Sequence, residues 1–139
     1  MPEVSVIVPV LNEAGTVLEL SERVAATLDG IGRRFEIVFV DDGSSDGTRE
    51  RVREANEMDS RVKLVSLRRN FGKAAALCAG FDHSRGDILI TMDGDLQDDP
   101  DEIPRFLDKL ETENLDLVSG WKRQRQDPAS KRYPSRLFN

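Results

Sequence analysis

Runs of apolar residues, each about the length of a single strand, recur along the chain and alternate with segments that have helical spacing. Valine, isoleucine and leucine fill these runs almost without interruption, which is typical of strands buried on both faces of a parallel sheet. The chain holds four or five such runs, at residues 4–10, 35–40, 62–67, 88–92 and 115–118. This alternation predicts an α/β domain with a mostly parallel sheet.

Helix-start signals lie between the apolar runs, where apolar side chains at helical spacing predict the intervening helices. Asp99 is expected to cap one helix, with Pro100 in its first position and Glu102 closing a capping box. Asn12 and Asn70 are expected to cap the helices that follow their strands.

Length and composition narrow the possible classes of protein. The chain has 139 residues, enough for one domain. No stretch approaches the ~20 apolar residues of a transmembrane helix, and no basic region precedes the first apolar run, so we expect no signal peptide and a cytoplasmic location. The single cysteine, Cys78, excludes an internal disulfide, and the single histidine, His83, excludes a metal site built from several histidines.

Charge is distributed unevenly along the chain. The net charge is −6, and residues 121–139 carry six basic side chains and one acidic side chain, a net +5 that leaves −11 for residues 1–120. The acidic part argues against general nucleic-acid binding. The basic segment is expected either to meet phosphates or an anionic membrane surface, or to be a solvated terminus.

Polar clusters follow four of the predicted strands. Ligands of parallel sheets bind beyond the carboxyl ends of the strands, so these clusters are expected to share one crevice. They occupy residues 9–13, 41–47, 68–73 and 93–100.

The last cluster contains a candidate metal site. Asp93, Asp95 and Gln97 alternate along the loop start, which places their side chains on one side of an extended segment. Two carboxylates and an amide oxygen are hard ligands suited to Mg²⁺ or Mn²⁺ shared with a diphosphate. The alternative is a solvated acidic turn that caps the next helix.

The other clusters allow two interpretations each. Asp41 and Asp42 are placed to accept hydrogen bonds from a ribose or a base, or to form a turn before the next helix. Glu13, which follows Asn12, allows the same pair of interpretations. Lys73 lies near a predicted helix N-terminus, a position that favours bound anions, so it could contribute to an anion site. Such cations are more often ordinary surface charges.

Taken in order, the four clusters resemble a family 2 glycosyltransferase of the GT-A fold. They are most similar to the polyprenyl-phosphate glycosyltransferases, which comprise dolichyl-phosphate mannose synthase and its bacterial undecaprenyl-phosphate relatives. The resemblance covers the chain to about residue 120 and implies an N-terminal fragment of a Rossmann-like fold, with helices on both faces of the sheet and the C-terminal part missing. Residues 1–120 would bind the nucleotide sugar, and residues 121–139 would begin the acceptor side.

The resemblance also implies roles for individual residues. A metal on the donor diphosphate would be held by Asp93, Asp95 and Gln97. Lys122 and Arg132 would stabilise the reaction's negative charge, and Ser135 would contact phosphate. The nucleotide pocket would be lined by Pro9, Leu11, Glu13, Asp41 or Asp42, and Lys73, although the family often has tyrosine at the position of Leu11.

The reaction implied is an inverting sugar transfer from a UDP- or GDP-linked donor to a polyprenyl phosphate, at the cytoplasmic face of a membrane and with Mg²⁺ or Mn²⁺. Two other interpretations stay open. One is a response-regulator receiver domain phosphorylated on Asp93, although a whole strand–helix unit precedes Asp41. The other is a nucleotide- or metal-binding fragment without catalysis.

Overall fold

A four-stranded parallel sheet forms the centre of the computed structural model, which describes residues 1–118. The strands lie in the order β3-β2-β1-β4, and every neighbouring pair is parallel. Their bounds are β1 Val4–Val10, β2 Phe35–Asp41, β3 Val62–Ser66 and β4 Ile88–Thr91. The predicted parallel sheet is confirmed.

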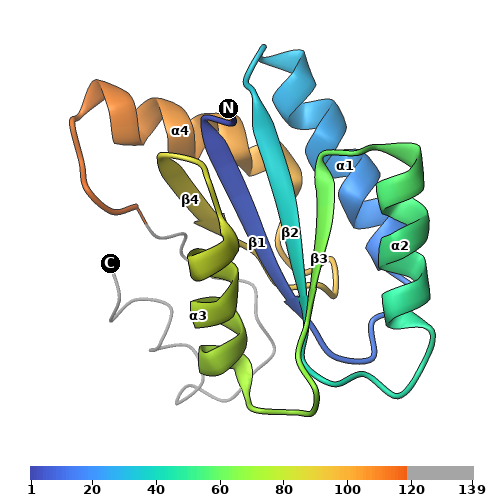
Figure 1. Cartoon of the computed structure of the whole chain (residues 1–139). Coiled ribbons are helices and arrows are strands. Elements are labelled where there is room, and N and C mark those ends of the chain that lie inside the picture. The colour runs from blue at the N-terminus through green and yellow to red at the C-terminus, as the bar shows by residue number, and fades with distance from the viewer. Residues whose placement is uncertain (119–139) are drawn as a thin grey trace. The chain divides into compact units, whose positions relative to one another are not determined.

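Helices cover both faces of this sheet (Figure 1). The chain moves from β1 to β2 to β3 in one direction, so α1 (Val17–Gly30) and α2 (Thr48–Met58) pack together on one face. It then returns across the sheet to β4, which places α3 (Lys73–His83) on the other face, as right-handed crossovers require. None of the helices within residues 1–118 is both long enough and apolar enough to cross a membrane.

The core lies between the sheet and these helices. On the α3 side, Ile7, Val38, Val40 and Ala76 form one buried cluster. Gly80 brings α3 close to the strands, since a Cβ there would lie 2.5 Å from Ile7 Cγ2. The alternate strand residues, such as the fully buried Phe39, point to the other face. Burial on both faces explains why the sequences of β1 and β2 are almost continuously apolar.

The chain divides into two compact units. The first is Met1–Asp101, and the second begins at Glu102 and contains α4 (Ile103–Thr112). The functional boundary expected at residue 120 stays a prediction. The Asp99 carboxylate accepts the Asp101 N–H at 2.9 Å, at the start of a short 3₁₀ turn, Pro100–Glu102. The N-cap residue of α4, which starts at Ile103, is Glu102, so the expectation that Asp99 caps this helix was wrong.

The fifth apolar run, residues 115–118, does not form a strand. The Leu115 N–H donates to the Leu110 carbonyl at 2.9 Å, and Asn114 adopts a left-handed conformation with φ of 51°. The start of this run therefore closes the end of α4 instead of pairing with a strand, as in common helix C-terminal motifs. The expectation of a strand here was wrong within the described residues.

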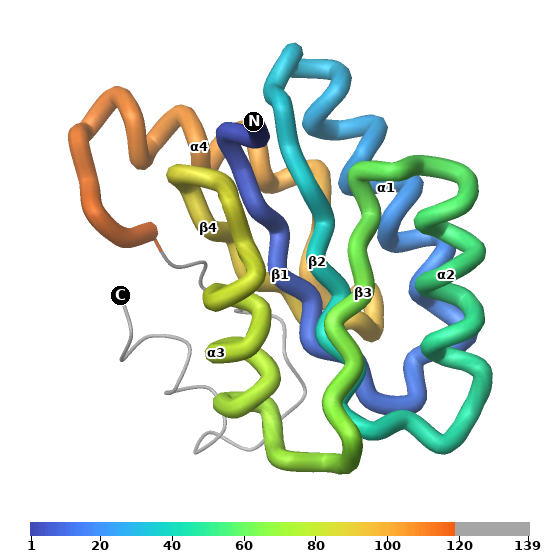
Figure 2. Tube along the Cα trace, viewed as in Figure 1, coloured from blue at the N-terminus to red at the C-terminus, as the bar shows by residue number. Residues whose placement is uncertain are grey.

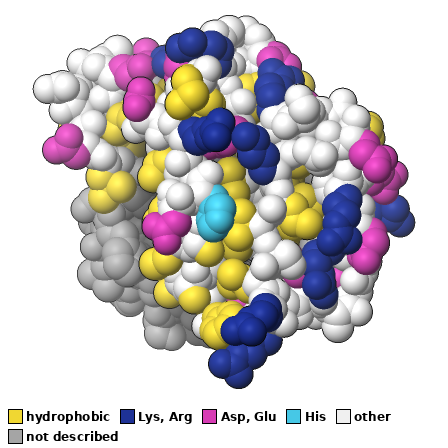
Figure 3. All heavy atoms as spheres, in the orientation of Figure 1, with side chains coloured by type: hydrophobic (Ala, Val, Ile, Leu, Met, Phe, Trp, Pro, Cys, Tyr) yellow, Lys and Arg dark blue, Asp and Glu magenta, His cyan; other side chains and the backbone are white. Residues whose placement is uncertain are grey.

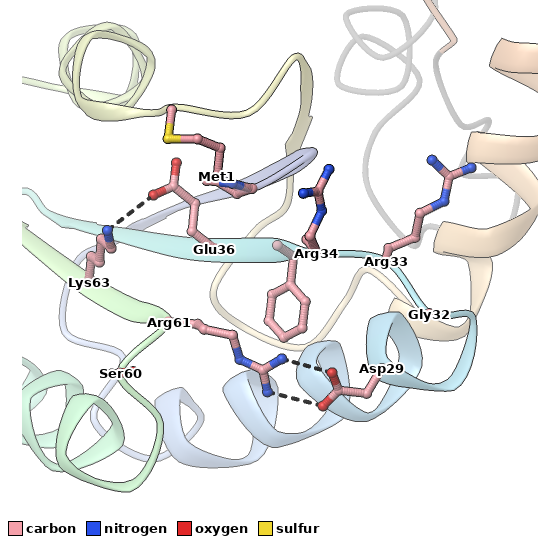
Figure 4. Close-up of a pocket in the computed structure, with 11 residues that line it drawn as sticks. Met1, Asp29, Gly32, Arg33, Arg34, Glu36, Ser60, Arg61 and Lys63 are labelled. Carbon is pink, nitrogen blue, oxygen red and sulfur yellow. Dashed lines mark hydrogen bonds and ion pairs between the residues drawn. The ribbon is translucent and has the colours of Figure 1, made fainter.

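A hollow of about 510 Å³ lies at the amino ends of the strands, and its basic residues pair with carboxylates. Figure 4 shows two of these pairs, Lys63 with Glu36 and Arg61 with Asp29. Arg61 donates to Asp29 at 2.7 and 3.0 Å and to Asp59 at 2.9 Å. Its guanidinium also lies 4.1 Å from the centre of the Phe35 ring. Arg61 thus joins the ends of α1 and α2 to β2. We therefore interpret the charged residues of this hollow as stabilising the fold.

Replacing Arg61 with methionine is expected to lower the free energy of unfolding by about 1 kcal/mol at neutral pH, because a partly exposed ion-pair network and a ring contact are lost. Arg61 lowers the pKa of both Asp29 and Asp59 from 3.8. The contribution of Arg61 to the free energy of unfolding is therefore complete above pH 3.8. It is lost as the pH falls through the lowered pKa values of Asp29 and Asp59. Urea unfolding across pH 2–7 measures this difference. Arg51→Met, which removes an exposed (i,i+3) ion pair with Glu54, is the control.

Candidate functional site

The loops that follow β1, β2, β3 and β4 meet at one edge of the sheet, the carboxyl edge, opposite the hollow around Arg61. Because the strands are parallel, all four of these loops leave the sheet at the same end. The loops after β1, β2 and β3 lie side by side in the trace (Figure 2). The structure therefore brings together the polar clusters that the sequence places after each strand, as expected.

Asn12 joins the first two of these loops. Its N–H donates to Ser44 Oγ at 2.9 Å, and its side-chain Oδ1 accepts the backbone N–H groups of Ser45 at 2.9 Å and Asp46 at 3.3 Å. Asn12 adopts a φ of 56°, a conformation that asparagine tolerates better than most residues. It does not cap α1, whose N-cap residue is Thr16, and the expectation of a cap at Asn12 was wrong.

Asp42 holds the loop after β3. Its carboxylate accepts the N–H of Phe71 at 2.8 Å and of Gly72 at 3.1 Å, just before α3 begins. Asn70 Oδ1 also accepts the Gly72 N–H, at 3.0 Å. Asn70 therefore bonds to the N-cap residue of α3, which is Gly72, and is not itself the cap.

Asp41 is fully buried and organises its own loop. Its carboxylate accepts the Ser44 N–H at 3.2 Å and pairs with Arg49 Nε at 3.2 Å. Asp41 and Asp42 therefore both show the turn-forming role that the sequence left as one of two interpretations. Contact of either residue with a nucleotide stays a prediction.

Acidic side chains from three loops approach one another at this edge. Burial raises the pKa of Glu13 above its ordinary value, and the negative charges of Asp95, Asp93 and Asp46 raise it further. Gly94 allows this approach, because a Cβ there would lie 2.7 Å from Val10 Cγ1 and 3.5 Å from Glu13 Cγ. The edge consequently carries a concentrated negative charge, which a cation would relieve.

Hydrogen bonds within the loop after β4 set its shape. The Asp93 N–H donates to Asp98 Oδ2 at 2.8 Å, and the Gln97 N–H donates to Asp95 Oδ1 at 3.1 Å. Leu96, between these residues, has a φ of 66°. Thr16 Oγ1 donates to the Gly94 carbonyl, which ties the loop to the start of α1.

A cation from α3 reaches this acidic group. Lys73 Nζ lies 2.6 Å from Asp93 Oδ1, with the two side chains 63% and 28% exposed. The loop before α3 also carries Arg69, whose guanidinium lies 4.7 Å from the centre of the Phe71 ring. Basic side chains gather at the lower edge of the α3 face (Figure 3). The carboxyl edge thus combines clustered carboxylates with adjacent cations.

The donor set fits a divalent cation that is shared with a ligand. In residues 1–118, no group of three or more acidic, histidine or cysteine side chains is arranged to hold a metal ion. Mg²⁺ in particular is commonly bound through one or two carboxylates, with substrate phosphates and water completing its shell. Asp93 and Asp95 are the two carboxylates at this edge that could meet this requirement, and Gln97 could add an amide oxygen.

The structure places some of the remaining predicted site residues and does not describe others. Leu11 is 40% exposed at the carboxyl edge, and Pro9 lies within β1 with its carbonyl near Gly94. The predicted phosphate contacts fall outside the described residues; they are Lys122, Arg132 and Ser135. Sequence reasoning missed the loop-joining role of Asn12. The sequence signal for this role was an asparagine in the loop after β1 and a Ser-Ser-Asp sequence, residues 44–46, in the loop after β2.

Residues 5–138 match the sequence profile of glycosyl transferase family 2, and the chain belongs to this family. The chain is 48% identical over 137 residues to the undecaprenyl-phosphate 4-deoxy-4-formamido-L-arabinose transferase of Pseudomonas aeruginosa. It is 44% identical over 126 residues to the dodecaprenyl-phosphate galacturonate synthase of Rhizobium johnstonii. These matches cover 98% and 90% of this chain but only 40% and 37% of the relatives.

A solved structure confirms the GT-A fold class. The mannosyltransferase PcManGT from Pyrobaculum calidifontis, in complex with GDP-Man and Mn²⁺, superposes with a TM-score of 0.66 at 30% identity. The superposition covers 79% of this chain and 32% of that protein. Family membership also overturns the response-regulator alternative, because receiver domains belong to a different family.

Proposed function

We propose that this chain forms the donor-binding part of an inverting glycosyltransferase that moves a sugar from a nucleoside diphosphate sugar to a polyprenyl phosphate. The observation that carries the proposal is the position of Asp93 and Asp95 just after β4 in a family 2 fold, where a Cβ on Gly94 between them would lie 3.5 Å from Glu13 Cγ. The relatives named for transfer to undecaprenyl and dodecaprenyl phosphate support the acceptor class. The chain spans about 40% of the length of these relatives.

The negative charge at the carboxyl edge suits the donor's metal. We assign Asp93, Asp95 and Gln97 as the residues that would hold Mg²⁺ or Mn²⁺; the ion supplies Lewis-acid stabilisation of the leaving diphosphate. Mn²⁺ in the PcManGT complex supports a divalent ion of this kind. Asp95 also holds the turn through the Gln97 N–H, so the site is shaped before any ligand arrives.

The nucleotide would lie across the loops after β1, β2 and β3. Pro9, Leu11 and Glu13 would line its pocket from the first loop, while Lys73 would face the diphosphate. Asp41 or Asp42 would contribute from the second loop. Because these two carboxylates already bond to backbone N–H groups, they also keep the pocket loops in place.

The acceptor would be bound by residues that follow the donor unit. We assign Lys122 and Arg132 to electrostatic stabilisation of the transferring group and Ser135 to phosphate contact. The phosphate of a polyprenyl phosphate is anionic at neutral pH, so the transfer requires no strong general base. The +5 charge of residues 121–139 would hold this end of the chain at the anionic cytoplasmic face of a membrane.

Metal-dependent binding of one nucleotide tests the proposal. We expect UDP or GDP, with Mn²⁺ or Mg²⁺, to raise the melting temperature by several degrees at 100 times its Kd, which corresponds to about 2.7 kcal/mol. The shift should disappear with a chelator. The absence of a shift with every nucleotide and metal would contradict the donor site. The alternative is a nucleotide- or metal-binding chain without catalysis. Donor binding without sugar transfer would favour it, if transfer is still absent after the remaining segment of a relative is fused to this chain.

A further inference from the structure

The position of Lys73 is electrostatically unfavourable for its own helix. Lys73 is the first residue of α3, and the N-terminus of a helix carries partial positive charge. Nothing about helix stability favours a cation there. A residue type that conflicts with local preference often marks a functional position.

Lys73 forms an ion pair with an acidic side chain of the carboxyl edge. Its ammonium lies 2.6 Å from Asp93 Oδ1, and Asp93 is one of the carboxylates whose negative charge raises the pKa of Glu13. The side chain of Lys73 is 63% exposed, so the lysine contacts Asp93 at the surface and is not packed into the core. The lysine therefore lies next to a carboxylate that is assigned to the metal.

We propose that Lys73 is a positioning residue that exchanges partners, from Asp93 in the free chain to the donor diphosphate in the loaded site; this inference rests on the proposed function. An ammonium and a divalent ion repel each other strongly at contact distance, so they cannot both hold the same carboxylate oxygen. The lysine side chain is flexible and exposed, which allows it to turn away at small cost. An anion at the start of α3 would then attract it, together with the helix terminus.

This exchange links the binding of metal and nucleotide. Without nucleotide, Lys73 competes with the metal for Asp93 and weakens metal binding. With nucleotide, Lys73 gains a new partner, so it adds to nucleotide affinity. The two ligands should therefore bind more tightly together than separately, with Lys73 carrying part of that coupling.

The test measures Mn²⁺ and nucleotide binding separately in the 139-residue chain. Mn²⁺ is titrated by electron paramagnetic resonance without nucleotide. UDP or GDP, whichever raises the melting temperature, is titrated by calorimetry with saturating Mn²⁺. For Lys73→Met we expect Mn²⁺ to bind roughly tenfold more tightly without nucleotide, because the cation that competes for Asp93 is removed. We expect the nucleotide to bind roughly tenfold more weakly with Mn²⁺ present.

Two further variants make the result specific. Lys73→Arg keeps the positive charge and should restore most of the wild-type coupling. Arg51→Met removes an exposed cation from another ion pair, with Glu54 at 2.9 Å, and should leave both affinities unchanged. Thermal unfolding of each variant confirms that the fold is retained.

The outcomes separate this inference from the function on which it rests. If Mn²⁺ binds wild type through Asp93 but Lys73→Met binds it equally or more weakly, the exchange is wrong and the donor site stands. Failure of Mn²⁺ and nucleotide to bind wild type at millimolar concentrations would overturn both. Tighter Mn²⁺ binding together with weaker nucleotide binding supports the exchange.

Discussion

Replacing Asp95 with asparagine is expected to weaken Mn²⁺-dependent nucleotide binding by about 100-fold or more. Loss of a metal-ligating carboxylate removes an interaction that contributes several kcal/mol, more than the loss of an outer-shell partner. Asparagine keeps an oxygen that can accept the Gln97 N–H, now 3.1 Å from Asp95 Oδ1. The substitution therefore tests the charge while retaining the turn, and isothermal titration with the selected nucleotide measures it.

Asp101→Asn is a matched control for this prediction. Asp101 is exposed and follows the same loop, and its backbone N–H bonds to Asp99. Its carboxylate is not assigned to the site, so we expect nucleotide affinity within about twofold of wild type. Equal affinities for wild type and Asp95→Asn in the presence of Mn²⁺ would show that the metal is bound elsewhere.

Replacing Gly43 with alanine is expected to lower the free energy of unfolding by about 3 kcal/mol and the melting temperature by roughly 10 °C. Gly43 has a φ of +85°, which is strained for alanine. A Cβ at this position would also lie 2.5 Å from the backbone C of Arg69 and the backbone N of Asn70. Because both contacts are with backbone atoms, the loop after β3 would have to move.

That movement connects the stability of the fold to the site. The loop after β3 is held by Asp42, the neighbour of Gly43, through the N–H groups of Phe71 and Gly72. It leads directly to Lys73, so Gly43→Ala should weaken nucleotide binding as well as lower stability. Differential scanning calorimetry and nucleotide titration on the same sample measure both effects.

Gly47→Ala is the control for the glycine prediction. Gly47 lies in the same loop, but its φ is −83° and a Cβ there would meet no atom within 4 Å. We expect a loss of no more than about 1 kcal/mol, because Gly47 is the N-cap residue of α2 and alanine is less favourable than glycine at that position. Equal melting temperatures for Gly43→Ala and Gly47→Ala would refute the close packing of the two loops.

Much of the fold follows from local sequence. The bounds of β1 agree with the predicted run, and those of β2, β3 and β4 differ by one residue at the carboxyl end. For β1 and β2 this agreement has a physical reason, since strands covered on both faces carry almost continuously apolar sequences. The polar clusters were also located correctly, because parallel strands place their following loops at a single edge.

The sequence by itself determined the parallel sheet, the edge at which the site lies and the residue types that suit a metal and a diphosphate. Tertiary structure alone decided which groups meet. It set Lys73 against Asp93, used Asp42 to hold the loop after β3, and ended α4 with Leu115 where a strand was expected. Apolar periodicity reports burial, which is a local property of the sequence. A contact between polar side chains 20 or more residues apart depends on how the loops fold against one another.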